Sequence, residues 1–208
     1  TASRAGHLKP GARVVDMGCA AGEFLFHLQR QYPGPAYGGV DVMPELIAKA
    51  REKVPGVAFD VGSVLDPAAL PEKSCDVVFL VGVLGIFPTF EPCLGNLLRW
   101  IKPGGRAYVY AAFNPYPLDV WVQYRRADEP DGPKEAGWNY YSVQSVSRFL
   151  DAQPAVRGYR FEPFYMPIDL PPQVDSVRAW TVRWEDGKRR QTNGLGLLRT
   201  QQVLEISC

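Results

Sequence analysis

The stretch of sequence that decides the fold runs from Val14 to Phe24 and reads VVDMGCAAGEF. It joins the apolar, partly β-branched run Ala12–Met17 to residues 23–31, where apolar side chains recur at helical spacing. Gly18 closes the apolar run. The pattern therefore predicts a buried strand, a glycine turn and a helix, in that order.

A carboxylate stands at the end of this predicted strand. Asp16, Gly18 and Gly22 follow the spacing acidic-x-G-x-x-x-G, which differs from the G-x-G-x-x-G of dehydrogenases that bind a diphosphate. Glycines at such a turn let the backbone approach a ligand closely, and the helix N-terminus presents free N–H groups to it. Because a carboxylate would repel a diphosphate, the turn favours a positively charged, nucleotide-like ligand such as S-adenosylmethionine, which carries an ammonium and a sulfonium.

Strand-like and helix-like patterns alternate outward from this turn. Pro44 suits the first turn of a second helix, and a helix is expected over about Glu91–Ile101, ahead of the chain-breaking residues Lys102–Gly105. Such alternation indicates a parallel sheet, with the most continuously apolar strand in its middle. The strands expected after the first are Tyr37–Val40, a strand beginning at Val57–Phe59, the central Cys75–Val81, and Arg106–Ala112.

The second half of the chain differs from the first in residue composition and in hydrophobic periodicity. Residues 114–138 are rich in proline and aromatic side chains without a clear period, which indicates a long ordered loop or lid. Ser142 can cap a helix that extends to about Leu150. Glu185-Asp186-Gly187 predicts a hairpin turn between Val177–Trp184 and Lys188–Thr192, and Leu195–Ile206 is expected as the last strand.

The first half resembles the class I S-adenosylmethionine-dependent methyltransferases, whose first motif is acidic-x-G-x-G-x-G. Asp16, Gly18 and Gly22 match this motif, and Ala20 stands where the middle glycine usually lies. The matches cover residues 12–112 in the family's order. The other matching segments are Gly39–Asp41 after the second strand, Val61–Asp66 after the third, Asp76–Phe87 along the fourth strand and its loop, and Leu98–Gly105 ahead of the fifth.

The resemblance implies roles for individual residues. Asp41, about 20 residues beyond the glycine turn, would bind the ribose, and Val42 or Met43 would line the adenine. Ser63 takes the place of an acidic residue that usually meets the adenine amino group, and Cys19 reads as a small apolar filler rather than a nucleophile. The expected cofactor-binding residues are Asp16, Gly18, Cys19, Ala20, Gly22, Asp41, Val42, Met43, Gly62, Ser63, Val64 and Val81.

The resemblance also implies the fold class and the domain organisation. The fold is expected to be α/β, with a Rossmann-like seven-stranded, mostly parallel sheet, helices on both faces, an antiparallel C-terminal edge strand and an added β-hairpin. Residues 1–208 are expected to form one domain. Residues 1–112 would be its cofactor-binding half, and residues 113–208 would supply the substrate-covering insert and the C-terminal strands.

The acceptor region is less constrained, because methyl transfer chiefly requires the reacting atoms to be aligned. If the acceptor is a hydroxyl, a general base would help. Candidates for that base are Tyr116, Asp119, Tyr124 and His7. The insert also offers Trp121, Arg125, Arg126 and Trp138, of which the arginines and Trp138 suit an anionic or planar acceptor. The alternative reading of these side chains is a solvated loop held by its aromatic residues.

The composition limits the kinds of partner and the cellular compartment that we expect for this protein. The chain has 208 residues, 46% of them hydrophobic, with 23 Lys and Arg against 22 Asp and Glu, so its formal charge of +1 does not favour nucleic acid. The four cysteines form no C-x-x-C pair, which predicts neither a metal site nor a disulfide framework and suits a reducing cytoplasm. No apolar run reaches the ~20 residues that span a bilayer, and no signal peptide is recognised.

These observations predict an enzyme of class EC 2.1.1.- that transfers a methyl group from S-adenosylmethionine to a small molecule and releases S-adenosylhomocysteine. The loop Val81–Pro88 lacks the Asn-Pro-Pro-Tyr type of motif used on adenine, cytosine or glutamine by enzymes that methylate amino groups. Three alternatives stay open: a non-catalytic cofactor-binding scaffold or regulatory module, a nucleic-acid methyltransferase, and a nicotinamide-dependent oxidoreductase, which the glycine spacing disfavours. The methylated atom and the oligomeric state are not predicted.

Overall fold

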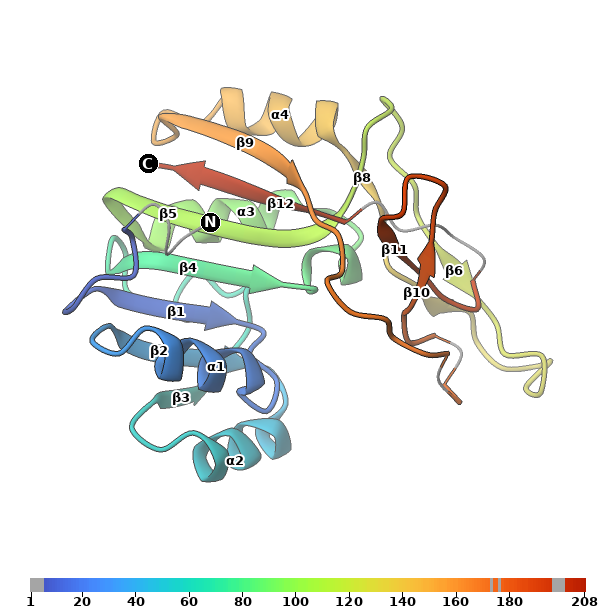
Figure 1. Cartoon of the computed structure of the whole chain (residues 1–208). Coiled ribbons are helices and arrows are strands. Elements are labelled where there is room, and N and C mark those ends of the chain that lie inside the picture. Colours follow the sequence, from blue (N-terminus) through green and yellow to red (C-terminus); the bar gives the residue numbers. More distant parts are fainter. Residues whose placement is uncertain (1–5, 173, 176, 196–200) are drawn as a thin grey trace.

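The computed structural model describes residues 6–172, 174–175, 177–195 and 201–208. A twisted central sheet has the strand order β3-β2-β1-β4-β5-β12-β9 along its main path (Figure 1). These strands are β1 (Arg13–Met17), β2 (Ala36–Asp41), β3 (Ala58–Val61), β4 (Cys75–Val81), β5 (Ile101–Asn114), β9 (Gly158–Pro163) and β12 (Gln201–Ser207), and the short β8 (Tyr141–Ser142) adds to the end of β5.

Strands β1 to β5 are mutually parallel, whereas β12 runs antiparallel to both of its neighbours, β5 and β9. The predicted α/β fold with a mostly parallel sheet and an antiparallel C-terminal strand is therefore confirmed. That strand is the last but one, because β9, which the sequence pattern did not indicate, occupies the edge itself. Of the predicted final strand, residues 196–200 lie outside the described residues.

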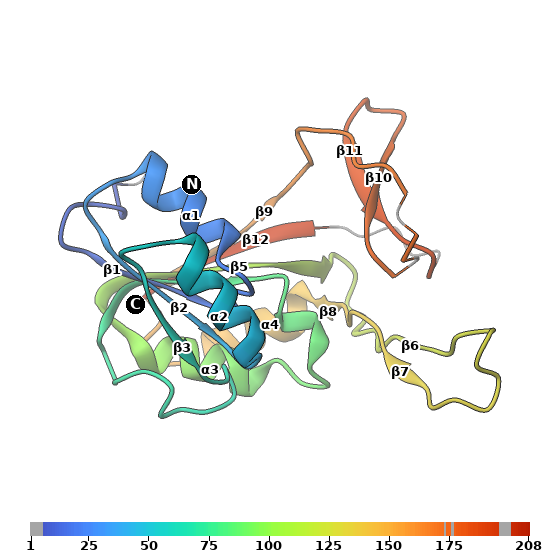
Figure 2. The same cartoon turned by 90° about the horizontal axis from the view of Figure 1, so that it is seen from below.

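Helices cover both faces of the sheet, as expected (Figures 1 and 2). They are α1 (Glu23–Gln31), α2 (Pro44–Lys53), α3 (Glu91–Trp100) and α4 (Val143–Asp151), with a short 3-10 helix, η1 (Leu84–Ile86), after β4. Val14 and Val77 pack with α1 and α2 on one face, whereas their neighbours Val15 and Val78 pack with α3 and α4 on the other. Because successive strand residues face opposite sides, a strand between two cores must be continuously apolar.

The predicted boundaries of α1 and β4 agree with the structure, but β5 is longer than the expected Arg106–Ala112. Lys102–Gly105 lies within this strand as an irregularity. Cys75 pairs with Ile101 while Val77 pairs with Arg106, so the strand has extra residues there. Gly104 adopts a φ of 83°, and its N–H donates to the carbonyl of Cys208. The glycine cluster therefore builds a bulge that contacts the end of the chain.

Two small antiparallel units extend beyond the carboxyl ends of the central strands (Figure 2). The predicted hairpin is confirmed as β10 (Trp180–Arg183) and β11 (Arg189–Thr192). Residues 114–138, expected as a loop or lid, contain a second pair, β6 (Gln123–Tyr124) and β7 (Glu135–Ala136). We call residues 120–140 the arm. The predicted cap of α4 is also present, since Ser142 Oγ accepts a hydrogen bond from the Ser145 N–H.

Candidate functional site

The turn between β1 and α1 has an unusual backbone. Gly18, Ala20 and Gly22 all have positive φ, of 80°, 48° and 82°. A Cβ at Gly18 would lie 2.4 Å from a methyl group of Val83, so only glycine fits where the turn passes the segment after β4. The Gly18 N–H donates to the carbonyl of Val40 at 2.7 Å, which fastens the turn to the end of β2 as well.

Asp41, the last residue of β2, ties this turn to the next helix. Its Oδ2 accepts a hydrogen bond from the Ala20 N–H at 2.9 Å, and its Oδ1 accepts one from the Met43 N–H at 3.0 Å. The side chain is half-buried. Each carboxylate oxygen has a second lone pair, so Asp41 can accept further hydrogen bonds from a ligand while it holds the backbone.

Asp16 lies beneath the same turn and is buried, with 2% of its surface exposed. Its Oδ1 has no hydrogen-bond partner among the described residues. Burial, and to a smaller extent the charge of Asp41, raises the pKa of Asp16 to about 7. The two carboxyls therefore form a site in which a nearby positive charge would stabilise the ionised form of Asp16.

The remaining predicted cofactor residues surround the carboxyl ends of β1 to β4. Val42 and Met43 expose 61% and 44% of their surface, as apolar side chains beside Asp41. Ser63 Oγ accepts a hydrogen bond from the Leu65 N–H. The Gly62 N–H donates to the Asp41 carbonyl, and the side chain of Val64 is buried. Val81 is the last residue of β4. Burial raises the pKa of the Cys19 thiol to about 12. A thiol with such a pKa is a poor nucleophile.

These features fit the group that the sequence implies. Acidic oxygens, a buried carboxyl oxygen (Asp16 Oδ1) without a hydrogen-bond partner among the described residues, a glycine backbone in close contact and exposed apolar side chains lie together at one edge of the sheet. They match the positive charge, the hydroxyls and the flat base of an adenosyl sulfonium. Among the residues that the structure describes, no group of three His, Cys, Asp or Glu side chains is arranged to hold a metal ion.

The candidate bases are engaged in structural contacts. Asp119 accepts hydrogen bonds from the Ser142 N–H at 2.5 Å and from Ser145 Oγ at 2.7 Å, at the start of α4. Although its partial burial acts in the opposite direction, these bonds hold the pKa of Asp119 below its usual value. Tyr124 donates to Glu135 at 2.7 Å, and this bond raises the pKa of Tyr124.

The two other candidate bases lie in contrasting places. His7 Nδ1 is 2.6 Å from the hydroxyl oxygen of Tyr108, in the middle of β5. Burial is the main cause that lowers the pKa of His7. Tyr116 is 70% exposed, and its backbone N–H donates to Asn114 Oδ1.

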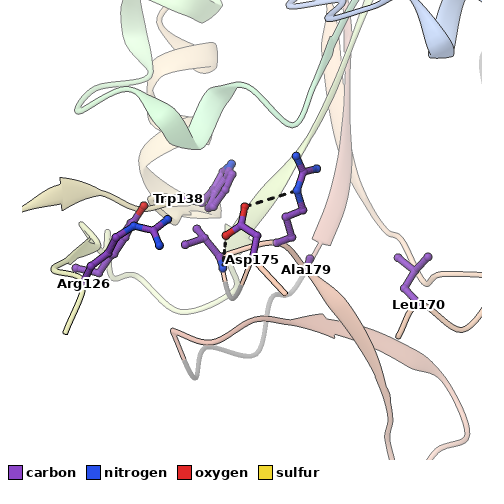
Figure 3. Close-up of a pocket in the computed structure, with 8 residues that line it drawn as sticks. Arg126, Trp138, Leu170, Asp175 and Ala179 are labelled. Atoms are coloured by element: carbon purple, nitrogen blue, oxygen red, sulfur yellow. Dashed lines mark hydrogen bonds and ion pairs between the residues drawn. The ribbon is translucent and has the colours of Figure 1, made fainter. Parts of the chain in front are cut away.

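A cavity of about 620 Å³ lies between the arm and the segment that leads into β10 (Figure 3). We call it the arginine cavity; it is lined by Tyr124, Arg126, Trp138, Leu170, Asp175, Val177, Arg178 and Ala179. The sequence pattern predicts the three arm residues, Tyr124, Arg126 and Trp138, for the acceptor region, but not Asp175 or Arg178. Arg178 falls within residues 177–184, which the pattern predicts as strand throughout. β10 begins only at Trp180.

Two predicted acceptor residues do not line this cavity. Arg125 donates to the carbonyl of Pro130 within the arm. Trp121 is 59% exposed, and its indole N–H donates to the carbonyl of Pro88. Both side chains therefore make structural contacts with backbone carbonyls.

A second cavity, of about 450 Å³, adjoins the glycine turn on the α1 side of the sheet. We call it the apolar cavity; its lining is Phe24, Phe79, Val81, Tyr108, Tyr110, Phe164, Met166, Gln191 and Val203. Phe24 belongs to the first turn of α1, and Val81 ends β4. The hydroxyl of Tyr110 donates to Gln191 Oε1 at 3.2 Å, which joins the sheet to β11.

Comparison with known proteins agrees with this fold and site. Residues 8–120 match the family model described as a methyltransferase domain, and the chain belongs to the class I S-adenosylmethionine-dependent methyltransferases. The predicted family and the prediction of an enzyme are thereby confirmed.

Two relatives with named activities are similar to this chain. The chain is 41% identical to trans-aconitate 2-methyltransferase from Methylobacterium nodulans, over 90% of this chain and 83% of that protein. It is 28% identical to fatty-acid O-methyltransferase from Mycolicibacterium smegmatis, over 70% of this chain and 54% of that protein.

Solved structures share the fold at low sequence identity. YcgJ from Bacillus subtilis has a TM-score of 0.60 at 16% identity, over 96% of this chain and 93% of that one. The DhpI complex with S-adenosylhomocysteine has a TM-score of 0.59 at 17% identity, over 98% of this chain and 79% of that one. In the part of the chain that the structure describes, no helix is long and apolar enough to cross a membrane.

The backbone of Ala20 supports a test of the turn. A non-glycine residue in the left-handed region costs about 1 kcal/mol, so we expect Ala20→Gly to be at least as stable as the wild type. Ala48→Gly, at an exposed position in the interior of α2, is the matched control and should lose about 1 kcal/mol. Denaturant unfolding measures both changes. Equal losses in the two variants would contradict a strained turn at Ala20.

The buried carboxyl of Asp16 predicts a pH dependence of the ligand-free protein. Between about pH 4 and pH 7 the folded protein keeps a proton on Asp16 that the unfolded chain has released. The contribution of Asp16 to stability therefore falls as the pH rises through this window and is level above it.

We expect Asp16→Asn to remove this dependence. The free energy of unfolding of the variant, relative to the wild type, should rise between about pH 4 and pH 7 by on the order of a few kcal/mol. Denaturant unfolding across this range measures the difference, and Asp60→Asn, at an exposed residue of β3, is the control. Parallel pH profiles for Asp16→Asn and wild type would exclude an abnormal pKa at Asp16.

Proposed function

We propose that this protein transfers the methyl group of S-adenosylmethionine to a carboxylate oxygen of a small organic acid, forming a methyl ester. The observation that carries the proposal is the 41% identity to a trans-aconitate 2-methyltransferase over 90% of the chain. The match to a fatty-acid O-methyltransferase supports the same class of acceptor, because both names give an acid.

A carboxylate acceptor does not require a general base from this chain. A carboxyl with an ordinary pKa near 4 is already ionised at neutral pH, so it needs no base to become a nucleophile. The hydrogen bonds that engage Asp119 and Tyr124 in structural contacts are compatible with such a reaction. Bound S-adenosylmethionine supplies a methyl carbon activated by its sulfonium, so the carboxylate oxygen bonds to this carbon, the carbon–sulfur electron pair returns to sulfur, and no proton is transferred.

In this proposal the first-half residues bind and orient the cofactor. Asp41 accepts hydrogen bonds from the ribose hydroxyls, and Val42 and Met43 cover the adenine. The left-handed turn through Gly18 lets the backbone approach the ligand, and the ionised carboxyl of Asp16 balances its positive charge. Ser63 offers its hydroxyl to the base. The acceptor lies beyond the carboxyl ends of β4 and β5, under the arm and the β10–β11 hairpin, which exclude water from the reacting atoms.

We also propose that the partner is a small molecule and that the protein is located in the cytoplasm. All four cysteines are free thiols, as suits a reducing compartment. The net charge of +1 gives little reason to expect a nucleic-acid substrate.

Cofactor binding tests the first half of the proposal. We expect calorimetry to detect binding of S-adenosylmethionine and S-adenosylhomocysteine to the wild type. Asp41→Asn should weaken both by about tenfold or more, because one oxygen that accepts a hydrogen bond becomes a donor and the charge is lost. Asp60→Asn, on the neighbouring strand, is the matched control and should bind as the wild type does. Unchanged affinity in Asp41→Asn, at unchanged thermal stability, would refute the assignment.

Methyl transfer to acids tests the second half. We expect mass spectrometry to find methyl esters when the enzyme is offered S-adenosylmethionine and a panel of small unsaturated and saturated acids. Mild alkali should hydrolyse the products, as it does esters but not methylated phenols or amines. A panel of phenols, amines and RNA is the comparison. Methylation confined to that panel, or no turnover with any compound, would refute a carboxylate acceptor.

A further inference from the structure

The arginine cavity brings together side chains from distant parts of the sequence. Arg126 and Trp138 come from the arm, and Asp175 comes from the segment before β10 (Figure 3). Arg178 belongs to the same segment as Asp175. From these residues we infer that the cavity binds a second, non-reacting carboxylate of the acceptor, held by Arg126 and Arg178. The inference rests on the proposed function and narrows the acceptor to a small acid with at least two carboxylates.

The ion pairs of these two arginines are long. Arg126 Nε lies 3.7 Å from Glu135 Oε1, and Arg178 Nε lies 3.6 Å from Asp175 Oδ2. Charge-assisted hydrogen bonds are about 2.7–2.9 Å long, and exposed pairs such as these contribute only about 0–1 kcal/mol. Glu135 also accepts the shorter bond from Tyr124, at 2.7 Å. A ligand carboxylate can therefore engage both guanidinium groups without breaking strong contacts.

The arginines of the adjacent hairpin behave differently. Arg189 binds Asp169 through two hydrogen bonds of 2.6 and 3.1 Å, and Arg190 binds Asp186 through two of 3.0 and 2.9 Å. These short, two-point contacts hold the hairpin together and leave those guanidinium groups committed. The contrast singles out Arg126 and Arg178 as the cations that can exchange their partner for a ligand.

Charge and size favour a small acid in this cavity. Its lining carries two arginines against one aspartate. The Val177 N–H donates to Asp175 Oδ1, which helps to fix this carboxylate beside Arg178. The volume of about 620 Å³ falls within the usual range for small-molecule sites, and the indole of Trp138 offers a flat surface to a conjugated acid.

The cavity is joined to the cofactor turn through a short segment. The Asn139 N–H donates to the Gly85 carbonyl at 2.7 Å, and a Cβ on Gly85 would lie 3.6 Å from Trp138 Cβ. Gly85 belongs to η1, two residues after Val83, whose methyl group lies against Gly18. In this inference the acceptor extends along this segment, with one carboxylate towards the turn and another between the two arginines.

Ligand binding, rather than turnover, tests this inference. With S-adenosylhomocysteine present, calorimetry would compare trans-aconitate, which has three carboxylates, with crotonate, which shares the double bond but has one. We expect trans-aconitate to bind the wild type at least tenfold more tightly than crotonate. Arg126→Gln and Arg178→Gln should each weaken trans-aconitate binding by about tenfold or more and leave crotonate binding within twofold.

The matched control is Arg125→Gln, because Arg125 is the neighbour of Arg126 but donates to Pro130 instead. It should bind trans-aconitate within twofold of the wild type. Arg126→Lys should recover part of the lost affinity, since it restores the charge but not the planar fork. Unchanged thermal unfolding and S-adenosylhomocysteine affinity establish that each variant is folded.

Three results would overturn the inference: equal affinity of the wild type for the two acids, trans-aconitate binding within twofold of wild type in both Gln variants, or binding of inorganic phosphate as tight as that of trans-aconitate. The outcome is separate from that of the proposed function. Acid methylation that is indifferent to Arg126 and Arg178 would refute only the second-carboxylate site. Arginine-dependent binding without any ester product would refute only the proposed reaction.

Discussion

The pair of backbone hydrogen bonds accepted by Asp41 is the constraint on which the candidate site depends. One bond holds the Ala20 N–H and the other the Met43 N–H, so a single carboxylate fixes the glycine turn relative to the start of α2. The turn must adopt three left-handed residues to reach this position, and the close approach to Val83 then requires glycine at Gly18. Parallel strands bring these loops to one edge of the sheet, where the ligand-binding residues of such folds gather.

Electrostatics gives this edge its selectivity. Burial raises the pKa of Asp16, and the nearby charge of Asp41 raises it further. Such an arrangement disfavours anionic ligands at the turn and leaves a partner of positive charge to be supplied from outside. The arginine cavity has the opposite preference. The two ends of the proposed active site thus distinguish a cationic cofactor from an anionic acceptor.

The first half of the fold could be predicted because its signals are local. The apolar run Cys75–Val81, the glycine turn and Pro44 each specify their own element, and their order specifies the sheet. The second half depends on long-range pairing that no local pattern encodes. β9 pairs with β12, which follows it by about 40 residues, and Arg178 and Trp138 line one cavity although they are far apart in the sequence. The hydrogen bonds that Asp119 accepts at the start of α4 are likewise not encoded locally, because their donors are 23 and 26 residues away in the sequence.

The hairpin has a consequence for the two cavities, because it and its approach form a partition between them. Leu170 and Ala179 face the arginine cavity, whereas Met166 and Gln191 face the apolar cavity. Asp169 braces this partition by pairing with arginines of both hairpin strands. Because residues of the hairpin and its approach line both cavities, a displacement of this partition would change the shape of both.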